Sequence, residues 1–176
     1  MAGLYYFNQT YRTEDYQLLQ DGTINNFESA GFNNDLDFSL LDPYFGFQYK
    51  VQVGEVTLRP GIIYHYYDWR NKQFEEATYN HNKSILLPEF KLEYEYRANR
   101  KLEFDYNLKS TFADAKYYAD RLSLTSFNQL YQGNREIENS LYHNFSLRLQ
   151  SFSIAKSFSS LFFTIKFPLS QAKYKS

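Results

Sequence analysis

Two adjacent stretches in the middle of the chain alternate strictly between apolar and charged residues, and this alternation constrains the fold more than any other feature. In residues 89–97, aromatic and aliphatic side chains occupy every second position with polar ones between them, and residues 102–109 repeat the pattern. A period of two is typical of a β-strand with one apolar and one polar face. The intervening Ala98-Asn99-Arg100 is short enough to join the two strands as a hairpin.

The rest of the chain predicts an all-β fold: an antiparallel meander of about seven or eight strands in one unit, residues 1–176, with a frayed polar tail at 168–176. Beside the hairpin, the pattern predicts strands at 4–19, 33–53, 56–66, 141–149 and 152–167. Because alternation is the same whether the apolar side faces lipid or a dry core, the pattern alone does not settle which face is inside.

Two local signals predict details of the strand pairing. Gly54-Glu55 has the composition of a two-residue hairpin turn, which would pair Val53 with Val56 and Val51 with Leu58. Within 33–53 the apolar residues change parity at Asp42-Pro43, and we expect a β-bulge there, since proline cannot donate to the ladder.

The connections between strands alternate in length. Long polar loops are predicted at 20–32, 70–83 and 113–138, the last with a short helical turn at 113–120, and the connections between them are short. This asymmetry is typical of outer-membrane barrels, which have tight turns on one side and extended loops on the other. Such barrels have an even number of strands from about 8 upward, so we expect an outer-membrane β-barrel or an incomplete part of one.

Composition supports the same interpretation. Aromatic residues make up 20% of the chain, with 18 Tyr and 17 Phe, and aromatic girdles at the membrane interfaces are a natural place for them. The mean hydropathy of −0.61 is low because polar residues alternate with the apolar ones along each strand and lower the average. The net charge of −1 gives no reason to expect nucleic acid as a partner. The first residues lack a secretory signal pattern, which predicts either that the protein is not exported or that the chain is a piece of a longer one.

The charged face of the hairpin supplies the candidate site residues. We interpret it as the wet wall of a barrel lumen, with basic and acidic residues interleaved. The lumen-facing candidates are Lys91, Glu93, Glu95, Glu103, Asp105 and Lys109. Four carboxylates on one face also permit a cation site, but calcium ligands normally come from a tight loop, so we predict no metal.

No other pattern in the sequence predicts catalysis or a cofactor. The three histidines, His65, His81 and His143, are far apart and form no close-spaced ligand pair, and His143 lies on the apolar parity of its strand. The serines of 151–160 have no nearby histidine and no G-x-S-x-G elbow, and Gly133-Asn134 is turn chemistry rather than a phosphate loop. We therefore expect neither an enzyme nor a cofactor.

Three segments resemble the barrel region of TonB-dependent receptors of the Bacteroidota type. These are Leu87 to Tyr94 (LPEFKLEY), Leu102 to Tyr106 (LEFDY) and Gly133 to Ser140 (GNREIENS). The last is similar to the family's Gly-Asn-Pro-x-Leu-x-Pro-Glu segment, with Arg135, Ile137, Asn139 and Ser140 at the positions that differ. The resemblance covers about residues 44–149.

The resemblance implies an outer-membrane location, contact with outer-membrane lipid, and import of an unknown nutrient ligand energised by the TonB system through a plug domain that these 176 residues do not contain. Ligand would bind at the external loops. Two alternatives remain open: a soluble β-barrel or sandwich that binds an apolar ligand inside, and a structural or adhesive β protein of the cell envelope.

Overall fold

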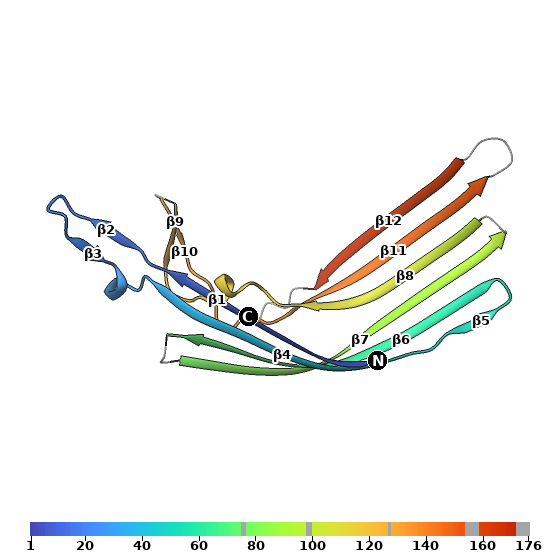
Figure 1. Cartoon of the computed structure of the whole chain (residues 1–176), viewed down its shortest axis with the longest axis horizontal. Coiled ribbons are helices and arrows are strands. Elements are labelled where there is room, and N and C mark those ends of the chain that lie inside the picture. Colours follow the sequence, from blue (N-terminus) through green and yellow to red (C-terminus); the bar gives the residue numbers. More distant parts are fainter. Residues whose placement is uncertain (75–76, 98–99, 127, 154–158, 172–176) are drawn as a thin grey trace.

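The computed structural model shows one dominant antiparallel sheet that curls into a half-barrel (Figure 1). It describes residues 1–74, 77–97, 100–126, 128–153 and 159–171. Along the sheet the strands lie in the order β1 (Ala2–Thr13), β4 (Asn34–Gln48), β6 (Val56–Gln73), β7 (Ala77–Arg97), β8 (Arg100–Thr111), β11 (Ser140–Ser153) and β12 (Ser159–Gln171), and β5 (Val51–Val53) pairs with β6. The predicted all-β antiparallel meander is confirmed.

The two long connections of the sheet carry small elements of their own. The first holds a hairpin of β2 (Tyr16–Leu18) with β3 (Ile24–Asn26), followed by the 3-10 helix η1 (Glu28–Ala30). The second holds the short helix α1 (Ala115–Tyr118) and a hairpin of β9 (Ser123–Ser126) with β10 (Gln129–Tyr131). The predicted helical turn in 113–120 is thus confirmed, whereas neither small hairpin was predicted. No helix in the described ranges is long and apolar enough to cross a membrane.

Both predicted short-range pairings are present. Val53 pairs with Val56 and Val51 with Leu58, and Gly54 has the positive φ of +58° that a tight hairpin turn needs at its first position. Strands β7 and β8 pair as the central hairpin, with Leu92 opposite Phe104, although residues 98–99 of its turn lie outside the described residues.

Three boundary predictions are wrong. Residues 70–83 do not form a long loop, because β6 continues to Gln73 and β7 begins at Ala77, with Arg70 paired to Asn80. The predicted first strand, 4–19, ends at Thr13 in β1, and 16–18 belong to β2. At the other end of the chain, β11 reaches Ser153 and β12 spans 159–171, so 168–171 is paired strand rather than frayed tail. Residues 172–176 lie outside the described part.

The predicted bulge at Pro43 is also absent. Leu41 pairs with Asp68 and Tyr44 with His65, so one register runs through the proline on the β6 side. On the β1 side Leu4 pairs with Pro43 in an equally continuous register. The change of apolar parity at this point must therefore have another cause, which lies in the two faces of the sheet.

We call the face on which α1 packs the inner face and the opposite one the outer face. Near one end of the strands the inner face is dry: Phe38 is fully buried, with its ring centroid 4.9 Å from that of Tyr118 in α1. The buried cluster consists of Leu36, Phe38, Leu40, Tyr67, Trp69, Ala115 and Tyr118. On the same stretch the outer face is polar, since Thr10 donates to Asp37 at 2.7 Å.

Toward the other end of the strands the polarity of the two faces is reversed. Phe45 and Phe47 point to the outer face and are 63% exposed. We call the exposed apolar residues of this region the outer belt: Leu4, Tyr6, Leu41, Phe45, Phe47, Ile62, Tyr64, Tyr66, Leu86, Tyr94 and Leu147. Strand β4 thus keeps its register and exchanges its apolar face, which explains the parity change that predicted a bulge.

Candidate functional site

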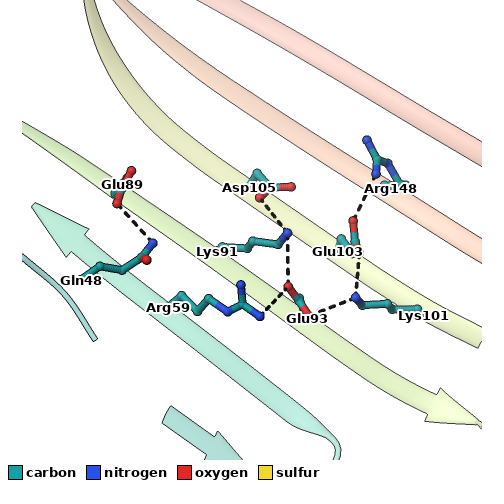
Figure 2. Close-up of polar contacts among 9 residues, drawn as sticks. All are labelled: Gln48, Arg59, Glu89, Lys91, Glu93, Lys101, Glu103, Asp105 and Arg148. Atoms are coloured by element: carbon teal, nitrogen blue, oxygen red, sulfur yellow. Dashed lines mark hydrogen bonds and ion pairs between the residues drawn. The ribbon is translucent and has the colours of Figure 1, made fainter. Parts of the chain in front are cut away.

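An ion-pair network occupies the inner face behind the outer belt, and Glu93 of β7 is its centre (Figure 2). Its carboxylate lies 3.0 Å from Lys101 Nζ, 3.2 Å from Lys91 Nζ and 3.4 Å from Arg59 Nη2. The alternation of β6, β7 and β8 sets this arrangement, because residues paired across antiparallel strands point to the same face. Although it is charged, the Glu93 side chain is only 13% exposed.

The network continues across β8 to β11. Lys101 also contacts Glu103 at 2.8 Å, and Arg148 Nη1 of β11 lies 3.5 Å from the same carboxylate. Lys91 reaches Asp105 at 4.0 Å. These side chains come from the neighbouring strands β6, β7, β8 and β11, and Figure 2 shows acidic and basic groups alternating across them. The charge of each of these side chains is therefore compensated by a neighbouring side chain of opposite charge.

The structure brings four of the six predicted lumen-facing residues together and leaves two apart. Lys91, Glu93, Glu103 and Asp105 belong to the network. The Glu95 side chain is exposed near the end of β7, and Lys109 is exposed near the far end of β8. The carboxylates of this face are separated by cations, and no cluster of metal-ligating side chains is found among the described residues.

A cavity of about 570 Å³ lies on the inner face between the network and the buried ring cluster. Its lining includes Asp42 of β4 and His65 of β6, whose Nδ1 lies 2.8 Å and 3.0 Å from the two Asp42 carboxylate oxygens. The His65 ring is stacked between Tyr44 and Tyr67, with centroids 5.4 Å and 5.3 Å away. The two stacked tyrosine rings restrict the orientation of the His65 imidazole. The imidazole in turn fixes the position of the Asp42 carboxylate.

The remaining histidines are dispersed. His81 stacks on Trp69 on the inner face, with centroids 5.2 Å apart. His143 lies on the outer face, where its Nδ1 is 3.0 Å from the Tyr106 hydroxyl. The three histidines thus serve three different packing environments and form no common site.

The three segments predicted as external loops meet at one end of the sheet. Phe32 forms a β-bridge with Leu122, which joins the first long connection to the second. Arg121 Nη2 donates to the Glu28 carbonyl at 2.6 Å, and its guanidinium lies over the Phe74 ring. The extended β6–β7 hairpin joins them through Lys83, whose Nζ contacts Glu138 at 2.6 Å.

A second hollow of about 490 Å³ opens beside this junction. Asn33 and Phe74 both line it, with φ of +64° and +50°, and they are the non-glycine residues with positive φ in the described part of the chain. A positive φ is well tolerated by asparagine, but for a bulky residue such as Phe74 it is costly and persists only where the surroundings enforce it. The three segments at the junction therefore pack together as one structural unit rather than as independent loops.

The Asp42–His65 pair and the loop junction were not predicted from the sequence. The pair could have been found by extending the hairpin register: if Val53 pairs with Val56, the same register places Tyr44 opposite His65. The junction depends on contacts between residues far apart in the sequence, such as Phe32 with Leu122 and Glu28 with Arg121, for which no local signal exists.

Comparison with known proteins does not identify the chain. No family model matches the sequence, and no curated protein matches it.

Proposed function

We propose that this chain forms part of the wall of an outer-membrane β-barrel that imports a nutrient ligand, in the manner of TonB-dependent receptors. The observation that carries the proposal is the outer belt, a continuous exposed apolar surface backed by a charged inner face. A sheet in water has the opposite arrangement, in which the polar face is exposed and the apolar face is covered by other parts of the protein. Large exposed apolar patches on a monomer mark a surface that another apolar medium covers.

The dimensions of the outer belt match a bilayer. On β6 the apolar outer-face positions, of which Ile62, Tyr64 and Tyr66 belong to the outer belt, run from Val56 to Tyr66, a distance of ten residue steps. At about 3.3 Å per residue this is roughly 33 Å of strand. With a tilt of about 40°, the belt is about 25 Å tall, the height of the apolar band of outer-membrane barrels.

Tyrosines lie at both margins of the outer belt. Tyr64 and Tyr66 are at the margin nearer the loops, where the Tyr64 hydroxyl is 2.8 Å from Ser84 Oγ. At the opposite margin the rings of Tyr94 and Tyr96 contact each other, 5.9 Å between centroids. Between the margins the outer positions of β6 are Leu58, Pro60 and Ile62. At the same level on β8 and β11 lie Tyr106, which pairs with Phe90, and His143, and the two side chains are joined by a hydrogen bond. Tyrosines at the margins and aliphatic residues between them are the order expected across a membrane from interface to core.

Beyond the outer belt the strands extend into a polar region that ends in the loop junction. Arg12 and Asp35 form an ion pair at 2.8 Å on the outer face there, as expected of a surface in water. Ligand capture is assigned to this end, because both long connections and the β6–β7 hairpin converge on it. The charged inner face would line the path of the ligand.

A soluble ligand-binding β protein is the second candidate, since the inner cavity with its aromatic lining would suit a buried ligand. Detergent dependence separates the two. The wall proposal requires the purified chain to aggregate in plain buffer and to give a folded β spectrum in detergent or vesicles. A folded, monodisperse protein in plain buffer would exclude it.

Cellular location gives a second test. After expression behind a secretory signal peptide in a bacterium with an outer membrane, the chain should remain in the outer-membrane fraction after a carbonate wash. Recovery in the washed-off supernatant would contradict membrane insertion.

A further inference from the structure

The inner-face cavity combines aromatic walls with an excess of negative charge. Its aromatic lining includes Tyr5 and Phe7 of β1, Tyr67 of β6, and Phe112, which follows β8. Its charged lining residues besides His65 are Asp42, Glu89, Lys109 and Asp114. Three carboxylates thus face one ammonium group, and negative charge remains in excess in either protonation state of His65.

Asp42 is the carboxylate of this lining that is best placed to bind a cationic group. It is 8% exposed, whereas Glu89 is half-buried and Asp114 is exposed. One histidine nitrogen serves both of its oxygens, so the carboxylate keeps unused acceptor positions. In a site of low exposure, attraction between a carboxylate and a cation is stronger than it would be in water.

We propose that this cavity binds a small organic cation with an aromatic body, the ammonium group on Asp42 and the ring among Tyr5, Phe7, Tyr67 and Phe112. Its volume of about 570 Å³ lies within the range of roughly 300–1,000 Å³ usual for small-molecule sites. Aromatic faces also attract a cation directly through their quadrupole. The inference does not depend on membrane insertion or import, because the cavity is built entirely from the inner face.

Three matched probes test the charge preference on the unaltered chain. They are 2-phenylethylamine, a cation; 2-phenylethanol, its neutral analogue; and phenylacetate, an anion. Binding is followed by the emission of Trp69, the single tryptophan, whose ring centroid is 5.2 Å from that of the cavity residue Phe112. In an uncharged maltoside detergent the amine should bind at least tenfold more tightly than the alcohol, and phenylacetate least tightly. Equal affinities, a preference for the anion, or no binding of the amine would overturn the proposal.

Two variants on the same strand locate the charge. Asp42→Asn should lower the amine affinity at least tenfold, to that of the alcohol, while Asp37→Asn, on the outer face of β4, should leave it unchanged. An amine affinity that Asp42→Asn does not alter would overturn the proposal. If the Asp42 variant does not fold, its unliganded Trp69 emission will show this, and the three-probe comparison decides. Because these titrations involve no vesicles, their outcome is separate from that of the membrane tests.

Discussion

A cationic side chain at the centre of the outer belt should destabilise the protein in a bilayer by an amount set by its depth. Ile62 is 44% exposed on the outer face of β6, six residues beyond Val56, the first apolar outer-face residue of that strand. At about 3.3 Å per residue and a tilt of about 40° it lies roughly 15 Å from the margin, close to the midplane of a band about 25 Å tall. Ile62→Arg should therefore cost about 2–4 kcal/mol of unfolding free energy.

The measurement is a urea titration of the chain folded in vesicles of uncharged lipid, followed by Trp69 emission. Tyr66→Arg, at the margin of the outer belt, should cost about 0–1 kcal/mol, because arginine reaches the interface there. Thr78→Arg provides a matched control, since Thr78 is an exposed residue of β7 on the outer face beyond the belt and pairs with Lys72. It should change stability by less than about 0.5 kcal/mol. Equal costs for Ile62→Arg and Thr78→Arg would refute the assignment of the outer belt to lipid.

Three further predictions concern the polar end of the sheet. Phe38→Ala removes a fully buried ring that contacts Phe7, Phe112 and Tyr118, and should cost about 3–5 kcal/mol in chemical denaturation, whereas Leu18→Ala, 67% exposed in β2, should cost less than about 0.5 kcal/mol; similar costs would contradict the packing described. Burial raises the pKa of Tyr118 to about 12, so the unfolded chain loses the phenol proton at a lower pH than the folded chain does. Stability should therefore be lost as the pH rises from about 10 to 12. The alkaline loss should be smaller in Tyr118→Phe by about 2–3 kcal/mol, and an unchanged pH profile would count against the buried phenol. At Gly133 a Cβ would meet the carbonyl oxygens of Tyr117 and Ala119, so Gly133→Ala should lower the melting stability by about 1–3 kcal/mol, while a neutral effect would show that the α1 loop is not held against this glycine.

The parts of the fold that the sequence predicted well are those fixed by local residues. The β5–β6 pairing follows from Gly54 and from apolar positions that match across the turn, and the structure has this register. The β7–β8 hairpin follows from an alternation that does not change along either strand, and the pairing has one register from Glu89 to Tyr94, with a shift between Tyr94 and Arg97. In both, the turn and the faces of the strands point to the same pairing, so the register has only one solution.

The errors come from places where the sheet exchanges its apolar face. Beyond Tyr66 the outer positions of β6 become Asp68, Arg70 and Lys72, while the inner ones end in the amides Asn71 and Gln73. With both faces polar, no period remains, and a paired strand has the composition of a loop. Backbone hydrogen bonding to β7 maintains the strand there. The periodicity of the side chains contains no signal of this pairing.

The candidate site was predicted in part for the same reason. The charged face of the hairpin carries five residues of the network, and four of them were among the predicted candidates because the alternation of this face is uninterrupted. Asp42 was interpreted as part of a bulge, so the contact of its carboxylate with the His65 imidazole was missed. Arg59 and Arg148 come from strands whose polar faces carry few charges, and only the assembled sheet places them beside Glu93 and Glu103.

The most direct test of the central claim is a scan of single cysteines along β6, which the absence of natural cysteines makes possible. Each variant is labelled with an environment-sensitive fluorophore and placed in vesicles that contain a quencher on the acyl chains. Quenching is expected at Leu58, Ile62 and Tyr64, and none at the neighbouring inner positions Thr57 and Ile63. Quenching at the inner positions, or equal quenching on both faces, would contradict a sheet whose apolar side faces lipid.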